Sequence, residues 1–274
     1  MTDRTPTVDQ SQPSIARVYD YLLGGRDNYA VDREIGDFFI RDLPGSAAIA
    51  FANRHALTRA VRAMSRDGIS QFVDLGSGLP TADNVHQVAQ RHNAATRVVY
   101  VDNDPAVLAH GRALLAADEG TEVIQADLRE PERILRHRDV RRLIDFDEPV
   151  GVVFSAVLHH LNDDERPADL VRWWVDRVPS DSRVYISHFR SGANEETRLA
   201  EQKLHGTFGR GRWRTDEEIA GLFGGLELLE PGLVNCSLWR PEPAPGDRAA
   251  GDGAGRRGLT AWEQLISCAL ARRP

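Results

Sequence analysis

Residues 72–81 read Phe-Val-Asp-Leu-Gly-Ser-Gly-Leu-Pro-Thr, an apolar run that ends in an acidic residue and enters a glycine turn. A segment that favours a helix follows, from residue 82 to residue 92. Gly76 and Gly78 have no Cβ, so the backbone can pass close to a ligand at this turn. The N-terminus of the next helix would offer free N–H groups to a polar or anionic group. Strand, glycine turn and helix in this order are typical of doubly wound α/β proteins that hold nucleotide-like cofactors at the carboxyl ends of their strands.

The composition excludes several classes of protein. The chain has 274 residues, of which 41% are hydrophobic and 27% charged, as in ordinary globular proteins. Its net charge of −7 argues against general nucleic-acid binding. Cys236 and Cys268, its only cysteines, lack the spacing of a disulfide framework or a metal site. No apolar run approaches the ~20 residues of a membrane span, and residues 1–13 lack the apolar core of a signal peptide. We expect a cytoplasmic protein without a metal, a membrane contact or a nucleic-acid partner. The sequence gives no prediction of the oligomeric state.

Apolar runs alternate with amphipathic segments from residue 70 onward, which favours a parallel sheet. Before them, helical periodicity recurs three times between residues 14 and 67. The strands are expected at residues 71–75, 97–102, 121–125, 150–155, 183–187, 226–234 and 262–271. The helices are expected at residues 14–23, 31–43, 46–66, 82–92, 105–117, 130–135, 163–178 and 215–223.

This order predicts a doubly wound, mostly parallel seven-stranded sheet whose last two strands form an antiparallel C-terminal hairpin. Residues 1–13 are expected to be a flexible tail, residues 14–67 a helical extension, and residues 68–274 the α/β domain. Residues 240–258 are rich in Pro, Gly, Ala and Arg, so we expect a flexible hairpin loop there.

Two further strands end in acidic residues. Residues 98–105 read Val-Val-Tyr-Val-Asp-Asn-Asp-Pro. Asp102 is placed to accept hydrogen bonds from ribose hydroxyls, and Asp104 is placed to cap the next helix, although either aspartate alone would serve as the cap. In Ala126-Asp127-Leu128, the Asp127 carboxylate can accept from an exocyclic amine while the next backbone N–H donates to a ring nitrogen. Together these two groups would recognise adenine.

A fourth stretch, residues 152–161, reads Val-Val-Phe-Ser-Ala-Val-Leu-His-His-Leu and follows the same pattern of strand and loop. The carbonyl of Ser155 is placed to accept from an ammonium group. His159 and His160 lie close to where chemistry would occur, and His188 ends the fifth expected strand. A structural histidine at a strand end is the alternative for each of the three.

The four stretches in this order resemble a class I S-adenosylmethionine-dependent methyltransferase over residues 70–190. Residues 75–81 and 19–29 further resemble an actinobacterial group of such enzymes that was long catalogued as a family of unknown function. The resemblance implies the fold, the cofactor S-adenosyl-L-methionine, its product S-adenosyl-L-homocysteine, and methyl transfer, but no acceptor. The cofactor contacts expected with it are Asp74, Gly76, Ser77, Gly78, Asp102, Asn103, Asp127, Leu128, Ser155 and Ala156.

Pro80 departs from the family pattern, which often has a small residue there. Proline cannot donate a backbone hydrogen bond, but it suits the first turn of a helix, where the N–H would be free. We therefore expect Ser77 and Gly78 to make the close approach to the methionine end of the cofactor, and Pro80 to stiffen the chain behind them.

The resemblance makes His159, His160 and His188 candidates for the base that assists a hydroxyl acceptor, with His159 favoured. Aromatic and polar side chains also crowd beside the Gly24-Gly25 turn. They would form a lid over the cofactor, or simply pack a helix end on the core. The lid residues expected are Tyr21, Arg26, Asn28 and Tyr29.

Two alternatives compete with a methyltransferase. A nicotinamide-dependent oxidoreductase would place a third glycine where Thr81 stands, and its acidic residue would follow at about 20 residues, closer than Asp102 follows Gly76. A protein that binds S-adenosylmethionine or S-adenosylhomocysteine without catalysis is the other alternative. We expect a small-molecule acceptor, because the chain shows neither a basic groove nor an added recognition domain.

Overall fold

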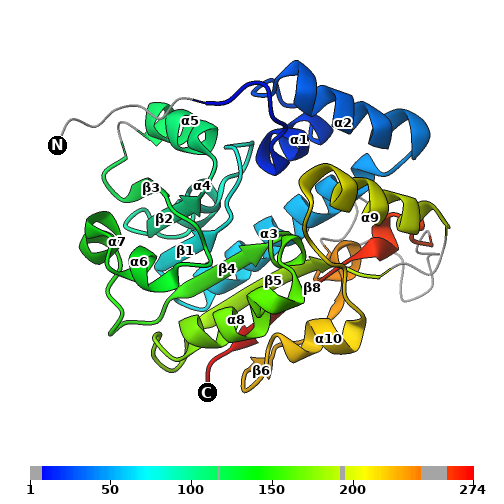
Figure 1. The fold of residues 1–274 in the computed structure, drawn as a ribbon. Coiled ribbons are helices and arrows are strands. Elements are labelled where there is room, and N and C mark those ends of the chain that lie inside the picture. Colours follow the sequence, from blue (N-terminus) through cyan, green and yellow to red (C-terminus); the bar gives the residue numbers. More distant parts are fainter. Residues whose placement is uncertain (1–7, 116–117, 192–194, 242–257) are drawn as a thin grey trace, which may run out of the picture.

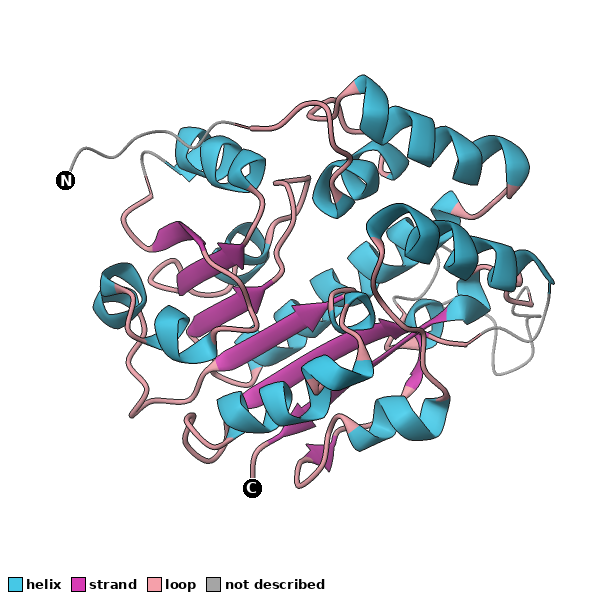
Figure 2. Ribbon diagram, in the orientation of Figure 1, coloured by secondary structure: helices cyan, strands magenta, loops and turns pink. Residues whose placement is uncertain are grey.

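A computed structural model describes residues 8–115, 118–191, 195–241 and 258–274. Its centre is a single eight-stranded sheet (Figures 1 and 2). The strands are β1 (Gln71–Leu75), β2 (Arg97–Asp102), β3 (Thr121–Gln125), β4 (Gly151–Ser155), β5 (Arg183–Phe189), β6 (Glu227–Leu228), β7 (Val234–Asn235) and β8 (Ile266–Arg272). The helices of four or more residues are α1 (Ile15–Leu22), α2 (Ala30–Asp42), α3 (Ala47–Arg66), α4 (Val85–Gln90), α5 (Pro105–Leu115), α6 (Pro131–Leu135), α7 (Arg138–Leu143), α8 (Pro167–Val175), α9 (Glu195–Phe208) and α10 (Asp216–Gly221).

The strand order is β3-β2-β1-β4-β5-β8-β6, with β7 paired to β8. The first five strands of this order run parallel, while β8 pairs antiparallel to β5, β6 and β7. The chain moves outward from β1 to β3 and then returns to β4 on the other side of β1. Parallel sheets bind ligands beyond the carboxyl ends of the strands at such a switch point, so the topology directs attention to the ends of β1 and β4.

Alternate residues of the central strands enter two separate cores, as the two-residue period of a strand requires. Val73 and Leu75 pack in a core with side chains of α6, α7 and α8, whereas Phe72 packs with side chains of α3 and α4. All five residues of β1 are buried. Helices therefore cover both faces of the sheet, which explains why the parallel strands read as continuous apolar runs.

Three helices lie beyond the carboxyl ends of the parallel strands instead of on a face. Figure 1 shows α1, α2 and α9 past the arrowheads of β1, β4 and β5. The long helix α3 continues from them across one face of the sheet, where it buries nine residues. The sheet edge that the sequence predicts as a binding site is thus enclosed by helices from both ends of the chain.

The fold class is confirmed, with differences in three of the expected elements. The helix expected at residues 82–92 is only α4, because Asn84 caps it and Gln87 completes a capping box. Pro80 therefore precedes the helix, and its expected place in the first turn is wrong. The strand expected at residues 226–234 is split into β6 and β7, since Pro231-Gly232 interrupts it. The start of the strand expected at residues 262–271 is instead a 3₁₀ turn, with Thr260 held by Glu263.

Helices α7 and α9 were not expected from the sequence. Of the expected tail, residues 8–13 are described and contact the rest of the chain: Val8 packs beside α5, and the Gln12 carbonyl accepts from Arg17 Nη2 at 2.5 Å. Of the expected hairpin loop, residues 242–257 lie outside the described residues. None of the described helices combines the length and apolarity needed to cross a bilayer.

Candidate active site

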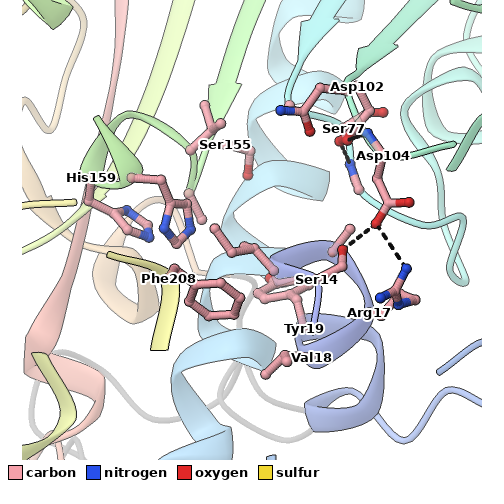
Figure 3. A pocket seen from close by; sticks show the side chains of 18 of the residues that line it. Ser14, Arg17, Val18, Tyr19, Ser77, Asp102, Asp104, Ser155, His159 and Phe208 are labelled. Carbon is pink, nitrogen blue, oxygen red and sulfur yellow. Dashed lines mark hydrogen bonds and ion pairs between the residues drawn. The ribbon is translucent and has the colours of Figure 1, made fainter. Parts of the chain in front are cut away.

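A cavity of about 610 Å³ lies at the carboxyl edge of the sheet, between the ends of β1 to β5 and helices α1, α3 and α9 (Figure 3). Its volume is within the ordinary range for small-molecule sites. The structure brings twelve of the expected site residues to this one cavity. They are Asp74, Gly76, Ser77, Gly78, Asp102, Asn103, Asp127, Leu128, Ser155, Ala156, His159 and His160.

The glycine turn after β1 needs both of its glycines. Gly76 and Gly78 adopt φ angles of +75° and +68°, which side chains rarely tolerate. A Cβ on Gly76 would also lie 2.3 Å from Cγ2 of Val157, whereas the space beside Gly78 is open. The turn is held over β2, since the N–H groups of Gly76 and Ser77 both donate to the carbonyl of Val101. Its open side, at Gly78, faces the cavity.

The two aspartates after β2 have separate roles. Asp104 accepts from the N–H of Ala106 at 2.8 Å and so caps α5. Asp102 accepts from the N–H of Gly78 at 2.8 Å and from that of Asp104 at 2.9 Å, which fixes its carboxylate at the cavity wall. Burial raises the pKa of Asp102 to about 6 despite these hydrogen bonds. The carboxylate keeps lone pairs for donors from a ligand.

Two buried polar atoms beside the glycine turn lack a partner within the described residues. They are Oδ1 of Asp74 and Oγ of Ser77. Asp74 is only 3% exposed, and burial raises its pKa to about 7 although Arg54 opposes this. Buried polar atoms are nearly always hydrogen-bonded, so these two atoms of the cavity wall are available to a ligand, and a cationic donor would best match the carboxylate.

Asp127 is already engaged by a neighbouring side chain. Arg129 Nε donates to Asp127 Oδ1 at 2.9 Å, and Arg129 Nη1 pairs with Glu165 at 2.6 Å. Burial opposes ionisation, but Arg129 holds the pKa of Asp127 below its usual value. Asp127 is therefore an ionised acceptor at the far end of the cavity, beside the backbone of Leu128.

The structure separates the three candidate histidines. His188 does not line the cavity: its Nδ1 donates to the Phe189 carbonyl at 2.6 Å, and its Nε2 contacts Arg214 Nη1 at 3.1 Å. With one ring nitrogen as donor and the other as acceptor, the His188 ring is neutral and serves the packing of the protein. Burial lowers the pKa of His188 to about 3. His188 thus lies behind the cavity wall, with its ring centroid 5.5 Å from that of His159.

His159 and His160 both line the cavity but differ in their bonding. Nδ1 of His159 accepts from the Phe189 N–H at 3.4 Å, which leaves its proton on Nε2. Burial, with His160, His188 and Arg214 adding to it, lowers the pKa of His159 well below its usual value. No hydrogen bond joins the His160 ring to another described residue, and burial with the nearby Arg210 lowers its pKa to about 4. His160 is therefore the neutral histidine with ring nitrogens available to a ligand.

The four expected lid residues do not line the cavity. Tyr21 donates to Asp37 at 2.7 Å, Asn28 donates to Asp20 at 2.8 Å, Arg26 is exposed, and the Tyr29 ring lies under the guanidinium of Arg17. The contacts of Tyr21, Asn28 and Tyr29 instead stabilise the turn between α1 and α2.

Helix α1 and its N-cap residue Ser14 supply side chains that close the cavity. Ser14, Arg17 and Tyr19 line it, and Figure 3 shows Ser14 and Arg17 reaching Asp104. The sequence reasoning missed these contacts, as it missed Asn53 of α3, which donates to Tyr19 and to Ser155 Oγ at 3.0 and 3.2 Å. The sequence shows only that polar residues such as Asn53 recur on the apolar face of a helix. This pattern does not indicate which residues they contact.

The whole chain, residues 1–274, matches a family model described as S-adenosyl methyltransferase. The chain belongs to this family. A presumed methyltransferase of Thermobifida fusca YX is 42% identical, with a TM-score of 0.90 over 100% of this chain and 99% of that one. A DUF574 family protein of Streptomyces avermitilis MA-4680 is 34% identical, with a TM-score of 0.89 over 98% and 100% of the two chains. No curated protein matches the chain.

The N-methyltransferase NodS of Bradyrhizobium japonicum WM9, in complex with S-adenosylhomocysteine, shares the fold at 15% identity. Its TM-score is 0.51, over 94% of this chain and 99% of that one. The protein is thus an S-adenosylmethionine-dependent methyltransferase of the class I fold. The alternatives of an oxidoreductase and of a non-catalytic binding protein are set aside by the family.

The residues at the cavity fit this cofactor. S-Adenosylmethionine carries an ammonium group, and Asp74 Oδ1 is a buried carboxylate oxygen that lacks a donor among the described residues. Its ribose has hydroxyl donors, and the Asp102 carboxylate stands at the end of the next strand. The open space at Gly78 lies between the two aspartates.

Proposed function

We propose that S-adenosylmethionine lies across the carboxyl ends of β1 to β4, with its methionine end at Asp74, Gly76, Ser77 and Gly78. The ribose then lies at Asp102 and Asn103, and the adenine at Asp127 and Leu128. Ser155 and Ala156 complete the wall beside the transferable methyl group. The observation that carries this placement is the pair of unpartnered atoms on Asp74 and Ser77, in the same cavity as the strand-end aspartates.

The proposal extends to the acceptor, which is a small molecule in the part of the cavity beside β4 and β5. The cofactor supplies an electrophilic methyl carbon, which an acceptor lone pair takes while the electron pair of the C–S bond stays on sulfur. The protein holds the two reactants in line, which is a large rate effect in itself. Of the histidines, we assign His160 to receive a proton from the acceptor, because its ring nitrogens have no partner among the described residues and it lines the cavity. His159 supports it by contact, with ring centroids 4.2 Å apart.

A cytoplasmic location is part of the proposal. Cys236 and Cys268 are both buried and free, which suits a protein of a reducing compartment.

Calorimetry with S-adenosylhomocysteine tests the cofactor placement. Asp102→Asn removes one acceptor oxygen and the charge, so we expect affinity to fall by about 1–3 kcal/mol, or roughly tenfold to a hundredfold. Glu122→Gln is the matched control: this acid lies on the adjacent strand β3, pairs with Arg142, and is not among the residues that line the cavity. Equal affinities for the two variants, both folded by circular dichroism, would remove Asp102 from the site.

A further inference from the structure

Part of the cavity extends beyond the strand-end aspartates toward β5 and α9. Six residues define this part, which we call the acceptor chamber: Leu57, His159, Phe189, Leu204, Phe208 and Trp213. Leu57 lies on α3, His159 follows β4, Phe189 ends β5, Leu204 and Phe208 lie on α9, and Trp213 follows α9. The chamber is thus built mostly from segments other than the strand ends at which we place the cofactor.

One wall of the acceptor chamber consists of stacked rings. His159 lies parallel to Phe189, with centroids 4.0 Å apart and planes 12° apart. Trp213 meets Phe189 edge-on at 4.9 Å and 77°. Figure 3 shows His159 and Phe208 facing the same space. Aromatic rings favour further rings in offset or edge-on contact, by more than the area buried alone gives.

No side chain that defines the acceptor chamber carries a charge. Two cations also line the cavity. Arg210 pairs with Glu165, and Arg54 is directed to the β1–α4 turn, where its Nη2 donates to Asn84 and to the Ala82 and Asp83 carbonyls, while its buried Nε has no partner among the described residues. The carboxylates among the lining residues belong to β1, to the turns after β2 and β3, and to the N-terminal segment. A charged group moved into the chamber would lose its hydration without a counter-ion.

The polar atoms at the edge of the chamber are neutral. Tyr19 donates to the Ala50 carbonyl and accepts from Asn53 Nδ2, both at 3.0 Å. Asn53 Nδ2 also lies 3.2 Å from Ser155 Oγ, and Ser187 Oγ donates to Asn53 Oδ1 at 2.5 Å. This network joins the chamber to the end of β4. It offers hydroxyl and amide groups to a neutral donor or acceptor and no charge to an ion.

We propose that the acceptor chamber binds an uncharged, planar aromatic molecule, whose reacting hydroxyl is directed toward Ser155. This inference rests on the proposed function, because it assumes that the cofactor occupies the ends of β1 to β4. The ring wall supplies contact for the flat face of the acceptor, and the aliphatic side chains Leu57 and Leu204 supply the remaining apolar surface.

A matched set of naphthalenes tests the class of acceptor. Binding of 2-naphthol, 2-naphthoate and 2-naphthylmethylammonium is measured by calorimetry on protein saturated with S-adenosylhomocysteine. The three share one ring system and differ in charge. We expect 2-naphthol to bind at least about tenfold more tightly than either ion, because neither ion finds a partner. Comparable affinity for an ion, or no binding of 2-naphthol at millimolar concentration, would overturn the proposal. Equal affinity for 1-decanol would overturn its aromatic part.

A variant pair shows whether the probes bind in the acceptor chamber. Leu204→Glu places a carboxylate in the acceptor chamber. The affinity for 2-naphthol should therefore fall, and the affinity for 2-naphthylmethylammonium should rise at least about tenfold. Leu199→Glu is the control, because Leu199 is exposed on the same helix and does not line the cavity. Should Leu204→Glu fail to fold, Phe208→Ala replaces it, with loss of 2-naphthol affinity expected. Unchanged preferences in the chamber variants would overturn the proposal. The affinity for S-adenosylhomocysteine is measured for every variant. If the wild type does not bind S-adenosylhomocysteine, the proposed cofactor placement is wrong. If it binds S-adenosylhomocysteine but prefers a charged naphthalene, only this inference is wrong.

Discussion

Asp74 shows how a ligand site opposes stability at a single residue. Its folded-state pKa of about 7 lies above the ordinary 3.8, so ionisation disfavours the folded state. The stabilising contribution of the protonated form is complete below pH ~4 and is lost as pH rises through about 7. A buried carboxylate that lowers stability in this way fits the ligand role that we propose for Asp74.

Asp74→Asn should therefore stabilise the ligand-free protein. At about pH 8 we expect the free energy of unfolding to rise by on the order of 1–3 kcal/mol, and the gain to shrink as pH approaches ~4. Urea unfolding at several pH values measures this difference. The same variant should bind S-adenosylhomocysteine more weakly, since it loses the partner of the ammonium group. A variant less stable than the wild type at pH 8 would contradict the origin that we assign to the raised pKa.

Cofactor affinity should depend on pH through the same carboxylates. Burial raises the pKa of Asp74 to about 7 and that of Asp102 to about 6, and a bound ammonium or ribose favours the ionised forms. A ligand that lowers a pKa binds more tightly as pH rises and gains nothing further above the free-protein pKa. Affinity for S-adenosylhomocysteine should thus increase from pH 5 to pH 7 and then level off. In Asp74→Asn the step near pH 7 should disappear and the step near pH 6 should stay; a flat wild-type profile would contradict both assignments.

At the scale of elements, α1 is held to the cofactor site by one buried cation. Arg17 Nε pairs with Asp32 of α2 at 2.8 Å, and Arg17 Nη1 lies 3.7 Å from Asp104 at the end of β2. Arg17 is 3% exposed and Asp32 is fully buried. Removing one partner of a buried ion pair leaves the other charge without a counter-charge. The folded state typically loses about 3–5 kcal/mol of stability as a result. Because α1 lies over the cavity and not within the sheet, the loss of stability should be confined to α1 and its contacts.

Arg17→Met should detach α1 while the sheet stays folded. Hydrogen exchange should accelerate in residues 15–22 with little change in β1 and β4, and S-adenosylhomocysteine should dissociate faster. Arg41→Met is the control, because the Arg41 side chain is 70% exposed and forms a surface ion pair with Asp37 across one helical turn. Uniform acceleration throughout the sheet would mean that α1 belongs to the core, contrary to this interpretation.

The sequence predicted the parallel strands far better than the helices over the cavity. β1, β2 and β3 have the expected bounds, because each contains adjacent buried apolar residues between polar ones: Phe72-Val73, Val98-Val99 and Val123-Ile124. Helix α9 was missed because only Thr197 and Ala200 are buried in it. It covers the cavity and meets the core only through Ala200, Leu204 and Phe208, so it carries no wide apolar stripe.

The same contrast holds for the site. Asp74 lies near the end of β1, Asp102 ends β2, and Asp127 lies two residues after β3, so parallel order alone places them at one edge. Tyr19 and Asn53 reach that edge from helices earlier in the chain, through contacts that no local pattern encodes. A strand-end residue can be placed once the strands are recognised, whereas a helix residue needs the tertiary packing.

For the whole molecule, the residues before β1 divide into two functional parts. α1 and α2 close the cavity, but α3 fills one face of the sheet: Ala60, Val61 and Met64 are fully buried, in one core with Phe72 and Tyr185. The helical extension of residues 14–67 is therefore proposed to be separable from the α/β domain only as far as the start of α3.

Two truncations test this division. A chain that starts at Ser46, the N-cap of α3, keeps both faces of the sheet covered, so we expect a cooperative but less stable unfolding transition and no binding of S-adenosylhomocysteine. A chain that starts at Asp67 lacks α3 and exposes a continuous apolar face, so we expect aggregation or loss of cooperative unfolding. Circular dichroism during thermal unfolding separates the two outcomes, and calorimetry reports the cofactor site. If the shorter chain unfolded as cooperatively as the longer one, α3 would be part of the lid, and the sheet would be stable with one face uncovered.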